Sequence, residues 1–171
     1  MSRRRRCPSY EDAMCPRTRE ALEEAIRGEA EAIRFYGHLI EMAPDQFQKD
    51  VIIGIRNDEA RHLNNFQAVY CRLMGCTYDY PEPHVRRPKN YCQGLIDAFN
   101  DEQEAYEFYK ANYFCNRDPW VKKAFLDAML DESEHAQWFN NFIVRNGCFR
   151  GFKLGVGETF EEEPASEVLL D

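Results

Sequence analysis

Apolar residues recur at the spacing of an amphipathic helix in four long segments of the chain, and no segment shows the strict alternation of a strand. The pattern predicts an all-α protein with helices over about Thr18 to Met42, Gln46 to Met74, Tyr91 to Cys115, and Pro119 to Asn146-Gly147. One face of each helix is expected to point into the core. In the second helix that face carries Val51, Ile52, Ile55, Glu59, His62, Phe66, Val69 and Leu73.

Residues with strong preferences for helix ends lie at the predicted boundaries. The first helix is expected to end just before Pro44, because a residue that precedes proline is biased away from the helical conformation. Asp45 can cap the start of the second helix, and Gly75 can end it in the left-handed conformation. Asp118 followed by Pro119 is typical of an N-cap and a first helical residue.

The first two helices, and the last two, are joined by short connections, whereas the middle connection runs from Cys76 to Asn90. A helix of about 27 residues is about 40 Å long. The middle connection can span about 50 Å when extended, so it can cross the full length of the bundle. Two helical hairpins joined by one long crossover make a ferritin-like four-helix bundle.

The two predicted hairpins are copies of one unit. A shift of 73 residues aligns Leu22 to Phe66 with Leu95 to Phe139 without a gap and gives 13 identical pairs. Several of these pairs are polar: Glu29/Glu102, Glu31/Glu104, Asp58/Asp131, Glu59/Glu132 and His62/His135.

Six of the repeated polar residues fall on faces that are otherwise apolar. In each hairpin a glutamate and a histidine lie one turn apart, and another glutamate precedes them by 30 residues. Buried carboxylates without compensation are costly, and two divalent metals would neutralise four glutamates and two neutral histidines. Oxygen and imidazole ligands favour iron or manganese over structural zinc. The alternative is a buried ion-pair network without metal. The six candidate ligands are Glu29, Glu59, His62, Glu102, Glu132 and His135.

This pattern resembles the ferritin-like di-iron carboxylate superfamily. The stretch Gly28-Glu29-x-x-Ala32-x-x-x-Tyr36 most resembles the first helix of rubrerythrins. The resemblance implies that Glu59 and Glu132 bridge two iron ions, while the other four ligands divide between them: Glu29 with His62, and Glu102 with His135. It also implies a homodimer or a larger homo-oligomer.

Two further pairs of residues are candidates for supporting roles. The run Asp58-Glu59-x-Arg61-His62 also resembles a motif of di-iron oxygenases, in which the aspartate fixes the tautomer of a ligand histidine. Asp58 and Asp131 are therefore each expected beside the histidine of the opposite hairpin, the alternative being solvated aspartates. Tyr36 and Tyr109 are candidates for hydrogen bonds to the ligands or for one-electron steps, the alternative being plain core aromatics. Surface or loop positions are expected for His38 and His84, and solvated positions for Glu31 and Glu104.

Two departures from rubrerythrins affect the expected chemistry. Ala105 stands where rubrerythrins usually carry an extra glutamate that takes part in their peroxidase cycle. The chain also lacks the paired CxxC motifs of a rubredoxin module, so a separate electron donor is expected.

Composition narrows the functional classes. The net charge of −8 argues against a nucleic-acid binder, and no apolar run approaches the length of a membrane span. The seven cysteines are expected to be reduced thiols, which together with the absence of a signal sequence favours the cytoplasm. The expected division is a basic segment over residues 1–17, the metal-binding bundle over residues 18–147 and an acidic tail over residues 148–171.

Three functions remain open at this point. The first is an oxidoreductase that reduces hydrogen peroxide or dioxygen at a di-iron site, with electrons from a partner. The second is a ferroxidase that serves iron storage, either as a cage or as cargo inside one. The third is a structural bundle that holds metal only for stability.

Overall fold

The computed structural model describes residues 17–148, which form four α-helices and, within that range, no strand. The bounds are Thr18–Met42 for α1, Gln46–Met74 for α2, Tyr91–Cys115 for α3 and Pro119–Arg145 for α4. The predicted all-α class and the two hairpins are confirmed. The predicted basic segment over residues 1–17 and the predicted acidic tail over residues 148–171 lie outside the described residues, except for Arg17 and Cys148.

Side-chain caps explain why the helices begin where they do. Asp45 accepts a hydrogen bond from the backbone N–H of Gln48 at 2.8 Å, and Asn90 does the same for Gln93 at 2.9 Å. Asp118 accepts from two backbone N–H groups of the first turn of α4, just behind the proline at its start. Gly75 ends α2 with a φ of 78°, a left-handed conformation that glycine adopts without steric cost.

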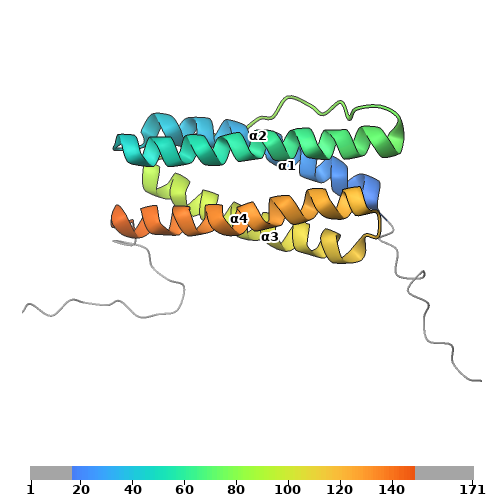
Figure 1. Ribbon diagram of the computed structural model, residues 1–171. Coiled ribbons are helices and arrows are strands. Elements are labelled where there is room, and N and C mark those ends of the chain that lie inside the picture. The colour runs from blue at the N-terminus through green and yellow to red at the C-terminus, as the bar shows by residue number, and fades with distance from the viewer. Residues whose placement is uncertain (1–16, 149–171) are drawn as a thin grey trace, which may run out of the picture.

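The two hairpins lie side by side, and α2 and α4 make the closest contact between them. The connection after α2 carries the chain back along the bundle, so α3 runs in the same direction as α2 (Figure 1). The long crossover is therefore present as predicted. By contrast, α1 and α3 touch each other far less than the helices within either hairpin do.

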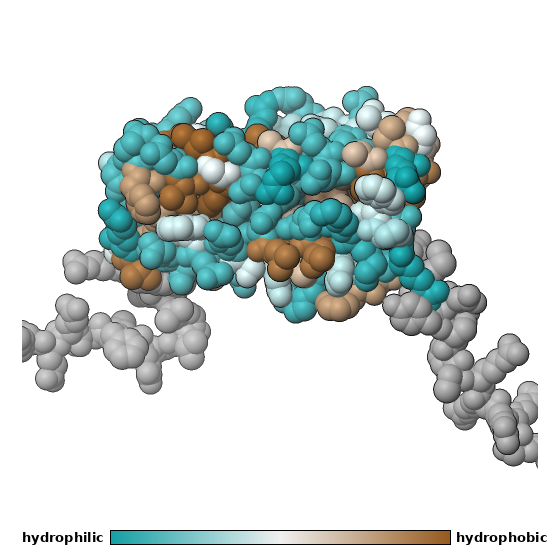
Figure 2. All heavy atoms as spheres, viewed as in Figure 1, coloured by the Kyte–Doolittle hydropathy of each residue, from teal (hydrophilic) through white to brown (hydrophobic). Residues whose placement is uncertain are grey.

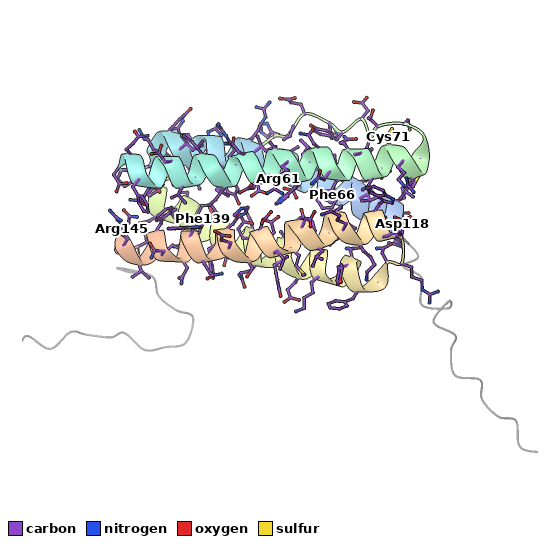
Figure 3. The ribbon with its side chains drawn as sticks, viewed as in Figure 1. Arg61, Phe66, Cys71, Asp118, Phe139 and Arg145 are labelled. Carbon is purple, nitrogen blue, oxygen red and sulfur yellow. A yellow bond between two sulfur atoms is a disulfide. The ribbon has the colours of Figure 1, made fainter. Side chains whose placement is uncertain are left out.

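Two apolar clusters form the core, one towards each end of the bundle. Phe66 belongs to the first and Phe139 to the second, although the two are equivalent in the repeat. They lie on either side of Arg61 along the bundle (Figure 3). Leu73 was predicted to face the core, and this was wrong. It lies in the last turn of α2 and is 40% exposed, because it borders a hollow at the end of the bundle that the ends of the other helices also line.

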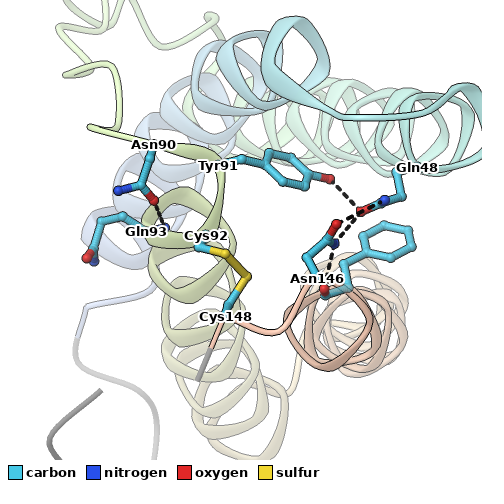
Figure 4. The surroundings of a disulfide bond; sticks show 8 residues. Gln48, Asn90, Tyr91, Cys92, Gln93, Asn146 and Cys148 are labelled. Carbon is cyan, nitrogen blue, oxygen red and sulfur yellow. Dashed lines mark hydrogen bonds between the residues drawn. A yellow bond between two sulfur atoms is a disulfide. The ribbon is translucent and has the colours of Figure 1, made fainter. Parts of the chain in front are cut away.

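A disulfide joins Cys92, in the first turn of α3, to Cys148, just beyond α4 (Figure 4). Cys115 is disulfide-bonded as well, whereas Cys71 and Cys76 are exposed free thiols. The prediction that all the cysteines are reduced is therefore wrong. The start of α3 and the end of α4 meet at one end of the bundle, which brings together two cysteines that are distant in the sequence.

The face formed by α2 and α4 is covered mainly by hydrophilic residues, with separate apolar patches (Figure 2). Leu130 and Val144 on α4 are among the exposed apolar side chains. None of the helices in the described part of the chain combines the length and the hydropathy that crossing a bilayer requires.

Candidate metal centre

All six predicted ligands lie buried in the middle of the bundle, between the two apolar clusters. None is more than 3% exposed. Each helix contributes at least one of them, because every ligand is on the inward stripe of its helix. The full set is Glu29 from α1, Glu59 and His62 from α2, Glu102 from α3, and Glu132 and His135 from α4.

The first group of candidate ligands surrounds His62. Its Nδ1 atom lies 3.2 Å from Oε2 of Glu59, 3.3 Å from Oε1 of Glu132 and 3.7 Å from Oε1 of Glu29. One ligand atom from each of the four residues can be chosen so that all lie within 4.8 Å of one another. A single cation placed among these atoms could contact all four side chains.

The second group surrounds His135 in the same way. Its Nδ1 atom lies 3.0 Å from Oε2 of Glu132, 3.1 Å from Oε1 of Glu59 and 3.6 Å from Oε1 of Glu102. Glu59 and Glu132 therefore belong to both groups, while Glu29 and Glu102 each belong to one. This division matches the one implied by the resemblance, with two shared carboxylates between two positions.

The charges in this cluster are compensated by protons when no metal is bound. Burial, with the charges of Glu59 and Glu132, raises the pKa of Glu29 well above its usual value, and the same causes act on Glu102. Burial lowers the pKa of both histidines, but the nearby carboxylates of Glu132 and Glu59 outweigh this effect. The pKa of His62 is raised to about 10 and that of His135 to about 11.

The residues present fit a pair of divalent metals. Oε1 of Glu59 and Oε1 of Glu132 are buried without a hydrogen-bond partner, which is costly for a carboxylate oxygen. Each of these oxygens lies close to the histidine of the opposite hairpin. Oε1 of Glu59 is 3.1 Å from Nδ1 of His135, and Oε1 of Glu132 is 3.3 Å from Nδ1 of His62. A metal ion there would supply the missing partner for both.

Two buried tyrosines donate hydrogen bonds to Glu29 and Glu102, the outer carboxylates, each of which belongs to only one group. Tyr36 on α1 donates a hydrogen bond to Oε1 of Glu102 on α3 at 2.5 Å, and Tyr109 on α3 donates to Oε1 of Glu29 on α1 at 2.6 Å. Burial and the adjacent carboxylates raise the pKa of both hydroxyls well above the usual value, so both remain protonated donors. The structure thus places these tyrosines against the candidate ligands.

The far side of each imidazole ring faces an aspartate from the opposite hairpin. Nε2 of His62 lies 2.9 Å from Oδ2 of Asp131, and Nε2 of His135 lies 3.5 Å from Oδ2 of Asp58. A carboxylate in this position fixes which nitrogen carries the proton and leaves Nδ1 free for a metal. The structure therefore brings together the two aspartates and the two histidines that sequence reasoning paired.

Comparison with models of known protein families gives no match. Over 123 residues the chain is 36% identical to the uncharacterized protein YhjR of Bacillus subtilis (strain 168). The aligned residues make up 72% of this chain and 84% of that protein. The chain belongs to the YhjR family. A solved structure, the hypothetical protein Pfu-1136390-001 from Pyrococcus furiosus, has a similar fold, with a TM-score of 0.65. It is 20% identical and covers 74% of this chain and 88% of its own, so this likeness concerns the fold alone.

This YhjR-family chain also has a cavity that sequence reasoning missed. It has a volume of about 760 Å³, lies along α1 and α3, and reaches Glu29, Glu59, Glu102 and Glu132. Small residues leave it room, since its walls include Gly28, Ala32 and Ala105. No periodicity in the sequence encodes how far apart two helices stand. The only local signal is the pair of small residues Ala32 and Ala105, which the repeat places at equivalent positions of α1 and α3.

The walls of the cavity also include several residues that were expected to be plainly solvated. Glu31 and Glu104 are exposed, as predicted, but they line this cavity together with Glu24 and Asp101. His84 lies in the crossover, as predicted, and forms another part of the wall. His38 is half-buried in α1 and belongs to neither group of candidate ligands.

Proposed function

We propose that this protein is a di-iron oxidoreductase that reduces hydrogen peroxide or dioxygen. The observation that supports this most strongly is the pair of Glu/His groups that share Glu59 and Glu132. A pair of iron ions held there would supply the electrons and bind both oxygen atoms of the oxidant. Manganese is compatible with the same donor set.

The chain's own residues would prepare and protect such a site. The four carboxylates balance the charge of two divalent cations, and the apolar clusters shield the site from water at the two ends of the bundle. Tyr36 and Tyr109 hold the outer carboxylates in place, and they are the buried O–H groups nearest to the site that could donate a proton or an electron. The cavity offers a small oxidant a way in.

The protein would depend on a separate electron donor. The free thiols of the described residues, Cys71 and Cys76, are exposed near the end of α2, and neither lines the cavity. A reductase or a small redox protein would therefore return electrons to the site after each turnover. Ala105 lines the cavity where rubrerythrins usually carry a further glutamate, so a peroxidase cycle that uses such a ligand is not part of the proposal.

A ferroxidase is the second candidate, and the acidic cavity favours it. The carboxylates of Glu24, Glu31, Asp101 and Glu104 line the approach to the site, and a cleft lined by one sign of charge concentrates ions of the opposite sign. Fe(II) would then be a substrate that enters from this side and gives its electrons to dioxygen or hydrogen peroxide, and Fe(III) would be the product.

Stopped-flow spectroscopy of the full chain, loaded anaerobically with two equivalents of Fe(II), separates the two candidates. The oxidoreductase proposal expects peroxide or dioxygen to oxidise the two bound irons and a chemical reductant to restore them for further turnovers. If added Fe(II) instead continues to be consumed into ferric product well beyond two per chain, the ferroxidase candidate replaces it. If bound iron reacts with neither oxidant, both are wrong and the metal is structural.

A further inference from the structure

The two halves of the site carry opposite charges at the residue that precedes each ligand histidine. The repeat pairs each candidate ligand, each tyrosine and each aspartate of the site with an identical residue 73 positions later. Arg61 breaks this rule, because its counterpart is Glu134, a residue of opposite charge. Both side chains are solvent-accessible on helices that carry ligands, and each directly precedes a ligand histidine.

Arg61 contacts the aspartates of both hairpins. Its Nη2 atom donates to Oδ1 of Asp58 at 2.6 Å and to Oδ2 of Asp131 at 2.9 Å. The guanidinium thus bridges α2 and α4 at the surface, and Arg61 lies about halfway along the bundle (Figure 3). No second arginine can do the same from α4, since Glu134 occupies the equivalent position.

The contacts between aspartate and histidine are correspondingly unequal. Oδ2 of Asp131 receives Arg61 and also lies 2.9 Å from Nε2 of His62, so this carboxylate oxygen is fixed from two sides. Asp58 offers its Oδ1 to Arg61, and its Oδ2 stays 3.5 Å from Nε2 of His135, beyond a good hydrogen bond. One histidine is therefore oriented by an aspartate more firmly than the other.

We propose that Arg61 is a positioning residue that makes the two metal positions unequal, so that the position with His62 binds metal more tightly than the position with His135. This inference rests on the proposed dimetal site. A hydrogen bond to the outer nitrogen of a ligand histidine fixes the ring and raises its basicity, and loss of such a partner typically costs 10- to 100-fold in metal affinity. A difference of about tenfold or more between the positions is expected.

Single-histidine variants measure each position separately. His135→Ala leaves the position with His62, and His62→Ala leaves the position with His135. Co(II) is the probe, because its visible absorption reports the geometry of its ligands as well as its affinity. The expected result is that the His135→Ala protein binds one Co(II) about tenfold more tightly than the His62→Ala protein.

Exchanging the two charges tests whether Arg61 is the cause. The double variant Arg61→Glu/Glu134→Arg, made in each single-histidine background, is expected to reverse the order of affinities. Arg61→Gln serves if the exchange prevents folding, and it is expected to weaken the position with His62 more than the position with His135. Arg56→Gln, another arginine of α2, is the matched control and is expected to leave both affinities within twofold. Thermal melting of each variant reports its folding separately.

Equal Co(II) affinities in the two single-histidine proteins would overturn the inference, as would an order that neither Arg61 variant alters. An Arg61→Gln protein that is less stable but keeps the tenfold difference would show a purely structural role and would also overturn it. A parent chain that binds no metal would overturn the proposed function and this inference with it. Two equal metal positions would overturn the inference alone.

Discussion

The hydroxyl of Tyr109 on α3 donates a hydrogen bond to Oε1 of Glu29 on α1 at 2.6 Å, across the most open side of the bundle. Tyr36 and Glu102 make the reciprocal contact in the opposite direction. Since α1 and α3 otherwise touch little, these two hydrogen bonds fix the outer carboxylates where packing alone would leave them free to move. The cavity can therefore stay open beside the site while the carboxylates of Glu29 and Glu102 remain fixed.

Replacing Tyr109 by phenylalanine should weaken the site and leave the core packing intact. The ring packs on Phe66 and Phe125 with centroids 5.4 and 5.8 Å away, and phenylalanine keeps both contacts. The buried oxygen of Glu29 loses its donor, which should cost about 1–3 kcal/mol of unfolding free energy in the metal-free protein. Chemical denaturation measures this cost, and Tyr106→Phe, at a half-buried position, is the control with an expected change under about 0.5 kcal/mol. Equal effects of the two changes would contradict the account.

The metal-free protein should lose stability as the pH rises. The pKa values of His62 and His135 are raised in the folded state to about 10 and about 11, so their protonation stabilises the fold fully below about pH 6.5. This contribution is lost as the pH rises through the folded-state values. The raised pKa values of Glu29 and Glu102 act with the same sign. Thermal melting in the presence of a chelator should give a Tm that falls steadily from pH 6.5 to pH 9.5.

Bound metal should stabilise the fold increasingly as the pH rises. A ligand histidine must be neutral, so metal binding displaces the protons and becomes more favourable at higher pH. The gap in Tm between metal-loaded and metal-free protein should widen from pH 6.5 to pH 8.5. A metal-free Tm that is flat or rises over this range would show that the buried histidines are not protonated in the folded state.

The close approach of α3 to its neighbours requires glycine at position 94. A Cβ atom there would lie 2.4 Å from Cδ2 of Leu39 and 2.9 Å from Cγ of Pro88, so Gly94→Ala should destabilise the fold by about 1–3 kcal/mol. Gly54 on α2 has no such neighbour within 4 Å, and Gly54→Ala should stabilise the helix by about 0.5–1 kcal/mol. Denaturant titration of both variants checks the pair. A stabilising Gly94→Ala would mean that α1 and the crossover lie farther from α3 than described.

The acidic wall of the cavity should speed the entry of cations. The double variant Glu31→Gln/Glu104→Gln removes two negative charges from the approach while leaving every candidate ligand in place. Fe(II) loading, followed anaerobically by stopped flow at low salt, should slow several-fold, and the difference should shrink at high ionic strength. The exposed control Glu107→Gln, which is not part of the cavity wall, should have little effect. Equal loading rates for all three proteins would mean that metal enters elsewhere.

Much of this architecture could be predicted from the sequence because its signals are local or repeated. Asp45, Gly75 and Asp118 mark helix ends through contacts within one turn, and the periodic apolar faces fix the helices between them. The six buried Glu and His residues stand out because they are three residues that the repeat presents twice at the same spacing.

The features that could not be predicted depend on how separate elements meet. The disulfide between Cys92 and Cys148 follows from the ends of two helices lying together, and the spacing of cysteines in the sequence says nothing of that. The cavity follows from the distance between α1 and α3. Leu73 has the right periodicity for the core, but it borders a hollow between the helix ends. The contact of Arg61 with Asp131 joins two hairpins and has no local signature.

An anaerobic titration of the metal-free chain with Fe(II), followed by calorimetry, shows whether the buried carboxylates and histidines hold two metal ions. Saturation is expected at two Fe(II) per chain. Glu59→Ala, which removes a carboxylate shared by both groups, is expected to disrupt both positions, whereas Glu107→Ala on the surface of α3 should leave both intact. If the folded chain binds no Fe(II), or if Glu59→Ala binds two as tightly as the parent, the buried carboxylates and histidines do not form a dimetal site.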